Sequence, residues 1–246
     1  MTRPAPPVPT KEARGWSLAM TWHDLLFAHW PIASEALRAL LPRTDPPLDL
    51  DLRDGAAWLG IVPFRMSGIR FRWLPPVPGT AAFPELNVRT YVTAHGRPGV
   101  WFFSLDAASP LAVRAARATF HLPYFDADMA CAADGDGVRY RSRRTHRGGG
   151  EAQLEARYRP AGEVFRSAPG SLEHWLTERY RLFAADRRGR LWRGEIQHGP
   201  WPLQPAAVEF AALDMTRWLG LGLPATPPHL LFARRLEVRA WRLGPA

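Results

Sequence analysis

The sequence is almost without cysteine and lysine. Of its 246 residues only Cys131 is a cysteine, which excludes an internal disulfide bond and a zinc site built from cysteines. Only one of its 32 basic residues is a lysine, Lys11, so arginine carries nearly all of the positive charge. The low cysteine content fits a reducing compartment.

Long apolar runs and several signature motifs are also missing. No stretch approaches the roughly 18 apolar residues of a transmembrane helix. The start, MTRPAPPVPT, is too polar and proline-rich for a secretory signal. We therefore expect a cytoplasmic protein without membrane contact. No H-E-x-x-H, G-x-S-x-G or Walker motif occurs, and no G-x-G-x-x-G follows a strand, which disfavours zinc hydrolases, nucleophile-elbow hydrolases and phosphate-binding nucleotide folds.

Histidines do not indicate a metal site either. His23, His29 and His121 each lie near tryptophan or phenylalanine in the sequence, a setting typical of core or interface histidines. We expect neither a metal nor a cofactor.

The formal net charge of +9 allows two interpretations. A basic protein can bind nucleic acid, but a codon bias towards arginine, alanine, glycine and proline gives the same excess. The arginines are dispersed, and no helix-turn-helix, zinc finger or RNA-binding aromatic pattern occurs. We favour the codon bias and expect no nucleic-acid partner.

Hydrophobic patterning predicts one globular domain. The chain is 46% apolar, with 11 tryptophans and 12 phenylalanines to fill a core. We expect a disordered arm over residues 1–14 and a single domain over 15–246. Helical spacing or caps predict helices at 22–30, 34–41 (capped by Ser34), 109–122 and 171–178. Strands are predicted at 48–52, 57–64, 85–92, 100–106, 129–133, 138–145, 153–159, 180–185, 191–197 and 230–243.

Short hairpin links between these strands favour antiparallel pairing. The predicted fold class is therefore α+β, with a mainly antiparallel, curved or barrel-like sheet and a few short flanking helices. A Pro- and Gly-rich loop is expected at 74–82, and a proline-rich connection with a short helix between about residues 198 and 229.

The strand 85–92 carries the most informative pattern. Side chains alternate between the two faces of a strand, so Glu85, Asn87, Arg89 and Tyr91 share one face. A carboxylate, an amide, a guanidinium and a phenol in one row can line a pocket for a small polar molecule. Three interpretations stay open: Glu85 acts as general acid or base, Arg89 binds a ligand carboxylate, or the two side chains simply pair with each other.

The next strand offers two further polar side chains. Ser104 and Asp106 share a face there and could extend the same polar wall. The simpler interpretation is that Asp106 ends the strand before a helix that Ser109 caps.

Five consecutive segments carry a resemblance to a known family. They are LLFAHWPI, DGAAWLGIVPFRMSGIR, FPELNVRTYV, GRPGVWFFSLDA and AVRAARATFHLPYFDADM, and in this order they resemble the YqjF-like family of conserved uncharacterised proteins. The match covers roughly residues 20–243. That family is similar in fold to acetoacetate decarboxylase, which implies a mainly antiparallel barrel with surrounding helices and an enclosed pocket.

The resemblance also implies site residues. In the decarboxylase a helix runs into a Gly-x-Pro-Lys segment whose lysine forms a Schiff base with the substrate ketone. The similar segment here contains Arg117, keeps a proline at Pro123 and has Tyr124 where the lysine aligns, while Glu85 resembles the pocket glutamate. A Schiff base requires a primary amine, so this position cannot supply the decarboxylase mechanism.

The first functional hypothesis is a pocket for a small organic ligand, a carboxylate or a keto compound, formed by Glu85, Asn87, Arg89, Tyr91, Arg117 and Tyr124. Glu85 and Tyr124 are the candidate catalytic residues if a reaction occurs. The alternative is a non-catalytic structural or interaction protein with a self-satisfied Glu–Arg network. Whether the chain forms a homo-oligomer stays open.

Overall fold

The computed structural model describes residues 15–73 and 82–246. The predicted arm over 1–14 and nearly all of the predicted loop at 74–82 lie outside the described residues. No helix in the described ranges is long and apolar enough to cross a lipid bilayer.

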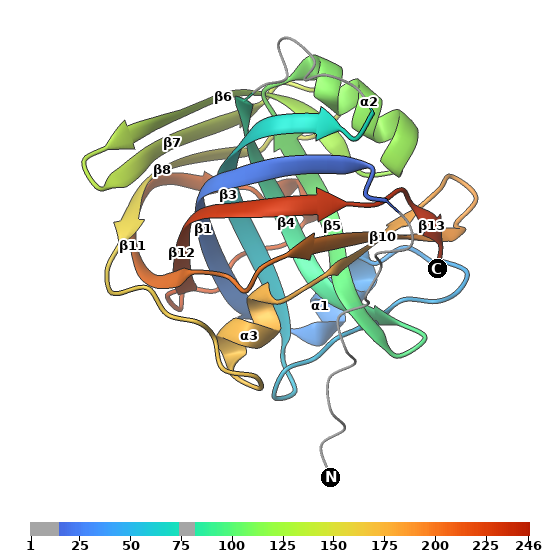
Figure 1. The fold of residues 1–246 in the computed structure, drawn as a ribbon. Coiled ribbons are helices and arrows are strands. Elements are labelled where there is room, and N and C mark those ends of the chain that lie inside the picture. The colour runs from blue at the N-terminus through green and yellow to red at the C-terminus, as the bar shows by residue number, and fades with distance from the viewer. Residues whose placement is uncertain (1–14, 74–81) are drawn as a thin grey trace.

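One thirteen-stranded sheet forms the body of the protein (Figure 1). Its strands are β1 (Leu18–Ile32), β2 (Asp49–Leu50), β3 (Ala57–Phe71), β4 (Ala82–Ala94), β5 (Arg97–Ala107), β6 (Tyr124–Asp134), β7 (Gly137–Arg144), β8 (Gln153–Pro160), β9 (Arg181–Ala185), β10 (Leu191–His198), β11 (Leu203–Asp214), β12 (His229–Ala240) and β13 (Gly244–Pro245). The helices are α1 (Ser34–Leu40), α2 (Pro110–Phe120) and α3 (Leu172–Thr177), with a 3-10 turn, η1, at Arg217–Leu219.

The sheet closes into a barrel because two of its strands, β5 and β12, each pair with two different strands along one edge. β5 pairs with β4 on one side and with both β6 and β9 on the other, and β12 pairs with β1 as well as with both β10 and β11. The strands β1–β3–β4–β5–β9–β10–β12 therefore form a closed barrel, which removes the exposed edges of an open sheet. The predicted barrel-like sheet is present, and its pairing is mixed, since β5 runs parallel to β6 and to β9 while the other pairings are antiparallel.

A second layer covers the outside of one barrel wall. Strands β6, β7, β8 and β11 pair in sequence and pack against the outer faces of β1, β3 and β4. The main hydrophobic core lies between these layers and includes Leu26, Ile61, Leu86 and Tyr140. The second layer therefore buries the outer faces of β1, β3 and β4. The inner faces of these strands line the interior of the barrel.

Two helices begin with the predicted caps. The Ser109 hydroxyl accepts a hydrogen bond from the Ala112 amide at the start of α2, and that of Ser171 accepts one from the His174 amide at α3. The cap predicted for α1 is wrong. Ala33 occupies the cap position, and the Ser34 hydroxyl donates to Glu35 instead.

The helix predicted at 22–30 is wrong, because these residues belong to β1. Leu25, Leu26, Phe27 and Ala28 are all buried, so both faces of this strand are apolar and its spacing imitates a helix. β1 pairs with both β3 and β12, and Asp24 adopts a left-handed φ of 53° where the register with β3 shifts. Strand pairing along both edges of this segment outweighs the helical spacing of its apolar residues.

β11 is a strand in a region where the sequence predicts a proline-rich connection. Pro200, Pro202 and Pro205 make this segment resemble a loop, yet residues 203–205 pair with β12 and residues 206–214 with β8. The predicted short helix nearby corresponds to the η1 turn. The strand predicted at 48–52 shrinks to the two residues of β2.

Candidate ligand-binding cavity

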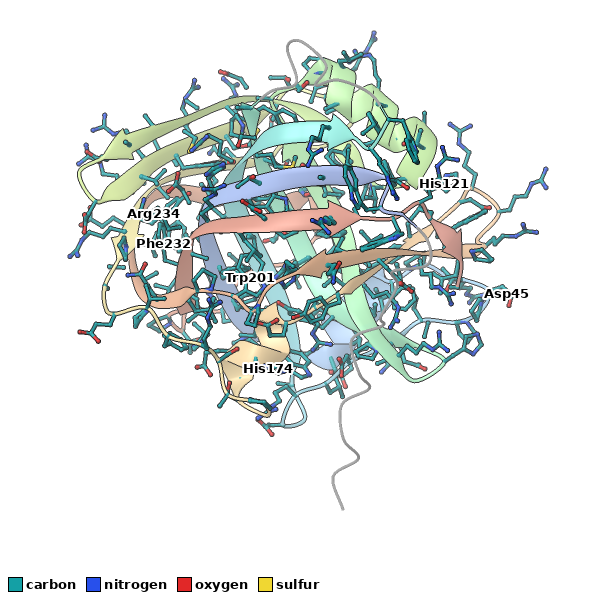
Figure 2. The ribbon with its side chains drawn as sticks, in the orientation of Figure 1. Asp45, His121, His174, Trp201, Phe232 and Arg234 are labelled. Carbon is teal, nitrogen blue, oxygen red and sulfur yellow. The ribbon has the colours of Figure 1, made fainter. Side chains whose placement is uncertain are left out.

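A cavity of about 1170 Å³ occupies the inside of the barrel. Its wall is built from the inward faces of β1, β3, β4, β5, β9 and β10, and α2 lies over one side of it. Most of the lining is aromatic or aliphatic, including Trp22, Phe27, Phe64 and Trp201. Figure 2 shows two of the lining residues, Trp201 near α3 and His121 at the end of α2.

The strand β4 contributes the polar row of this wall. Phe83, Glu85, Asn87 and Arg89 all line the cavity, as alternation on a strand requires. Their neighbours on β3, namely Met66, Phe64 and Val62 opposite the first three, line it too. The two ends of this row lie in different places. Phe83 lies near the end of β3 that continues to Phe71, and Arg89 lies near α3.

Glu85 is an acid in an apolar setting. It is 3% exposed, and the Tyr124 hydroxyl donates a hydrogen bond of 3.0 Å to its Oε2 atom. Burial raises the pKa of Glu85 from 4.5 to about 8, the nearby Asp106 charge adds to the rise, and the Tyr124 hydrogen bond opposes it. At neutral pH the carboxyl group is therefore mostly protonated, and it can both donate and accept a hydrogen bond.

Asn87 and Arg89 offer polar atoms that the protein leaves unused. Asn87 is 6% exposed, and its Oδ1 atom has no hydrogen-bond partner among the described residues. The buried Nε atom of Arg89 likewise has none. The Arg89 Nη2 atom makes only two long contacts of 3.4 Å, to the Tyr91 hydroxyl and to the Leu176 carbonyl. Unpaired buried polar atoms are costly, so such a cluster marks a place where a ligand can supply partners.

Positive charge dominates the lining. Arg89, Arg179, Arg181 and Arg242 line the cavity, and Glu85 is the sole carboxylate among its described lining residues. Arg179 pairs with Asp51 at 2.6 Å, and Arg181 lies 4.0 Å from Glu195. No ion pair joins Arg89 to a carboxylate anywhere in residues 15–73 and 82–246. The cavity therefore holds an uncompensated cation and a neutralised acid, which favours an anionic ligand.

The predicted pairing of Glu85 with Arg89 does not form. The two side chains lie on the same face, but the Arg89 guanidinium lies 5.5 Å from the Phe27 ring centroid and 5.7 Å from that of Tyr91. Glu85 turns to Tyr124 instead. The alternative of a self-satisfied network between Glu85 and Arg89 is therefore not present in the structure.

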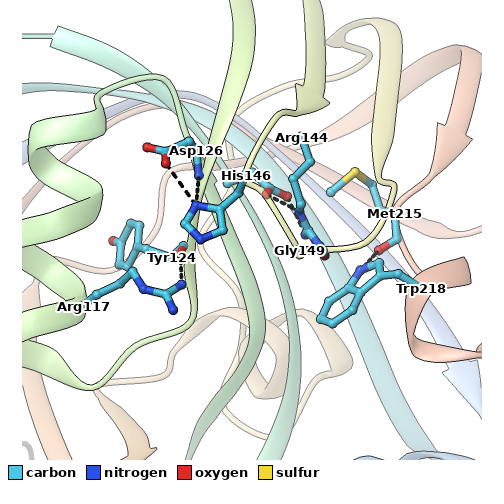
Figure 3. Close-up of polar contacts among 9 residues, drawn as sticks. Arg117, Tyr124, Asp126, Arg144, His146, Gly149, Met215 and Trp218 are labelled. Carbon is cyan, nitrogen blue, oxygen red and sulfur yellow. Dashed lines mark hydrogen bonds and ion pairs between the residues drawn. The ribbon is translucent and has the colours of Figure 1, made fainter.

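Two predicted site residues do not line the cavity. Tyr91 continues the row, but α3 closes the barrel beneath it. Its hydroxyl donates to the Leu176 carbonyl at 2.9 Å and lies 2.7 Å from Nε2 of His29, and its ring packs 4.7 Å from Trp175. Arg117 is exposed on α2 and donates from Nη1 to the Tyr124 carbonyl oxygen at 2.6 Å (Figure 3). It thereby fixes the backbone of Tyr124 from outside.

Ser104 and Asp106 face away from the cavity because of a β-bulge. Val88 pairs with Ser104 but Arg89 pairs with Phe102, so Phe103 is an extra residue on β5. The bulge reverses which residues face inward, and Phe102 and Leu105 line the cavity. Of the two interpretations of Ser104 and Asp106, the extended polar wall is therefore the one that the structure contradicts.

Asp106 instead forms a buried ion pair behind the wall. Its carboxylate accepts two hydrogen bonds from Arg144, of 2.7 and 2.9 Å, and both side chains are fully buried. The Arg144 guanidinium lies over the rings of Phe125 and Trp218 and donates to the Gly149 carbonyl oxygen (Figure 3). This bidentate pair anchors the end of β5 next to Glu85.

Several lining residues were not predicted. Thr177 ends α3 and Arg179 follows it, and Trp201 donates from its indole to the Thr177 carbonyl oxygen at 2.8 Å. Trp22 and Phe27 on β1 were read as helical, which hid their inward direction. Only the long-range closure of the barrel unites these segments, and no local pattern signals it.

No group of three or more metal-ligating side chains exists in the described part of the chain. His23 contacts Ser67 at 2.6 Å, His29 contacts Tyr91, and the ring of His121 lies 5.6 Å from that of Trp192. These three histidines therefore have ordinary packing or hydrogen-bonding partners.

Comparison with known proteins gives a consistent result. The model of the DUF2071 family, described as an uncharacterized conserved protein, matches residues 19–237. Over 228 residues the chain is 46% identical to the uncharacterized protein YqjF of Bacillus subtilis (strain 168), which covers 93% of this chain and 92% of that protein.

Solved structures of similar fold are far more distant in sequence. The enduracididine biosynthesis enzyme MppR, complexed with the condensation product of pyruvate and imidazole 4-carboxaldehyde, has a TM-score of 0.62 at 14% identity, over 96% of this chain and 93% of that one. The acetoacetate decarboxylase of Legionella pneumophila has a TM-score of 0.61 at 13% identity, over 100% and 92%. An acetoacetate decarboxylase-like enzyme from Sphingomonas wittichii RW1 has a TM-score of 0.62 at 13% identity, over 95% and 94%. At such identities the likeness shows the fold alone.

Proposed function

This chain belongs to the DUF2071 family of uncharacterized conserved proteins, and from its cavity we propose that it binds an organic acid, with the ligand carboxylate at Arg89 and the ligand body beside a protonated Glu85. The ligand class is a carboxylate with an apolar or keto-bearing body. The contacts of these two residues carry the proposal.

The unpaired guanidinium of Arg89 is the principal observation. A partly buried cation beside Phe27 and Tyr91 loses part of its hydration, and without a counter-ion the ring contacts and two long hydrogen bonds compensate only part of this loss. A ligand carboxylate would accept two parallel hydrogen bonds from the guanidinium, including one from the unpartnered Nε atom.

Glu85 suits such a ligand because its pKa lies at about 8. A protonated carboxyl group does not repel an anion, and it can donate a hydrogen bond to a carbonyl oxygen. If the ligand reacts, Glu85 is placed to give or take a proton, as a general acid or base with a pKa near the working pH does. Tyr124 orients it and has no amine to condense with a ketone.

The fold neighbours support the ligand class without fixing it. MppR is described as complexed with pyruvate, a small keto acid, in a barrel of the same fold. This chain has Lys11 as its single lysine, so we do not extend an imine mechanism to its cavity. Non-covalent recognition by Arg89, Asn87 and Glu85 is the form we propose.

Thermal unfolding with a panel of carboxylic acids and their uncharged amides tests the proposal. Arg89→Met removes the cation, and Arg143→Met, at an exposed position outside the cavity, is the matched control. A saturating acid should raise the melting temperature of the wild type and of Arg143→Met by about 5–10 °C, and that of Arg89→Met much less. If no acid raises it, or if Arg89→Met responds as the wild type does, the proposal fails.

A further inference from the structure

We propose, on the basis of the function proposed above, that the ligand is an elongated amphipathic acid. Its carboxylate would lie at the inner end of the cavity at Arg89, its body would pass Glu85, and its apolar tail would reach the rim formed by Phe71 and Leu111. Three observations lead to this substrate class: the size of the cavity, the spacing of its polar groups and the nature of its rim.

The cavity is too large for a short keto acid. Its volume of about 1170 Å³ lies above the roughly 300–1000 Å³ of sites that hold drug-sized ligands. A keto acid of roughly six or seven non-hydrogen atoms would leave most of this space to water. Water would there meet a wall that is mainly aromatic and aliphatic, which is unfavourable. An apolar ligand body of matching size removes that cost.

The spacing of the polar groups leads to the same conclusion. Glu85 and Arg89 are four residues apart on β4, so their Cα atoms lie roughly 13 Å apart. The Arg89 guanidinium leans further away, towards Tyr91. The carboxylate and carbonyl of a short keto acid are separated by one or two bonds and cannot contact both groups. A ligand that engages both is long.

The outer part of the cavity provides an apolar path for a tail. Beyond Phe64, β3 turns Met66, Ile69 and Phe71 into the lining. α2 faces them with Leu111, Ala112, Ala115 and Ala116, and its small side chains leave room between helix and strand. In Figure 1 this helix lies beside the end of β3, over one end of the barrel.

The rim itself is apolar and accessible. Phe71 is 41% exposed and Leu111 is 60% exposed, although both also line the cavity. Exposed large apolar side chains that continue an apolar cavity are typical of a ligand-binding groove. A tail that leaves the barrel between them would cover both.

Calorimetric titration with unbranched carboxylates of four, eight and twelve carbons tests this class of ligand. We expect the affinity to rise by about twofold to fourfold for each added CH₂ group, since each one leaves water for the apolar lining. The rise should persist beyond eight carbons because the path continues to the rim.

Two substitutions on α2 form a matched pair. Ala116→Phe fills the path, and Ala118→Phe adds the same side chain at an exposed position that does not line the cavity. Ala116→Phe should lower the affinity for the twelve-carbon acid by about tenfold and leave the four-carbon acid unchanged. Ala118→Phe should change neither.

The outcomes separate the two proposals. Affinity that depends on Arg89 but is the same for all chain lengths would overturn the elongated ligand and leave the acid-binding function standing. Equal effects of Ala116→Phe on short and long acids would also overturn it. If acids of every length fail to bind, the acid-binding function itself fails, and the elongated ligand fails with it.

Discussion

The hydroxyl group of Tyr124 donates a hydrogen bond of 3.0 Å to Oε2 of Glu85, although the two residues lie on strands separated by β5. Tyr124 begins β6 opposite Leu105, and Glu85 lies on β4 opposite Ala107. The bond therefore spans the strand between them and holds the carboxyl group against the cavity wall. The first two predictions concern this pair.

Replacing Tyr124 by Phe should raise the pKa of Glu85 above about 8, because the hydrogen bond from Tyr124 lowers that pKa and its loss leaves burial and the Asp106 charge unopposed. The carboxyl carbon shift of Glu85, followed by nuclear magnetic resonance over a pH titration, measures this value. Tyr158→Phe, whose hydroxyl donates to the Asp24 carbonyl oxygen, is the control. A pKa that stays constant or falls in Tyr124→Phe would refute the role of this bond.

Replacing Glu85 by Gln should remove a pH dependence of stability. The pKa of Glu85 rises from 4.5 to about 8 on folding, so the folded state binds the proton more tightly than the unfolded chain. Wild-type stability should therefore fall as the pH rises from about 4.5 to about 8 and stop falling above it, by at most about 5 kcal/mol.

Urea unfolding of both proteins at pH 5, 7 and 9 checks this sign. The buried Asp106 also has a raised pKa, so the difference between the wild type and Glu85→Gln is the informative quantity. That difference should shift in favour of Glu85→Gln as the pH rises. A constant difference from pH 5 to pH 9 would contradict the raised pKa.

Replacing Arg144 by Met should cost about 3–5 kcal/mol of unfolding free energy, because the fully buried Asp106 carboxylate would lose its partner. The double variant Asp106→Leu, Arg144→Met should recover a large part of this loss, since it leaves no buried charge. Urea denaturation of the single and double variants measures both effects. A double variant as unstable as Arg144→Met would show that the ion pair is not the cause.

Replacing Asn87 by Leu should stabilise the ligand-free protein by about 1 kcal/mol and weaken ligand binding. Asn87 is buried without a partner for its Oδ1 atom, so an apolar side chain of similar size removes a desolvation cost. Residues kept at such a cost are typical of functional sites. Thermal unfolding with and without a bound acid measures both effects, and a destabilised ligand-free variant would contradict a ligand role for Asn87.

Local patterns predicted the strand that carries the site. Alternation along β4 places Glu85, Asn87 and Arg89 on one face, and the structure agrees because β4 is regular on its β3 side. The contact between Glu85 and Tyr124 is not visible in any local pattern. Only the resemblance to a known fold brought Tyr124 near Glu85.

The failures of prediction have physical causes of two kinds. The direction in which the Ser104 and Asp106 side chains point depends on the bulge at Phe103. A single extra residue there reverses which side chains face inward along the rest of the strand. β1 is a strand because barrel closure pairs it with β12, and Tyr91 lies outside the cavity because α3 packs against it. Both contacts join segments that are distant in the sequence. Patterns within a strand carry no information on either.

A crystal structure of the protein with a bromine-labelled long-chain acid tests the binding site most directly, because anomalous scattering locates the bromine atom independently of the rest of the map. We expect the carboxylate within hydrogen-bond distance of the Arg89 guanidinium and the bromine between α2 and the end of β3. An acid bound only on the outer surface, with the Arg89 guanidinium still unpaired, would contradict the acid-binding function of this cavity.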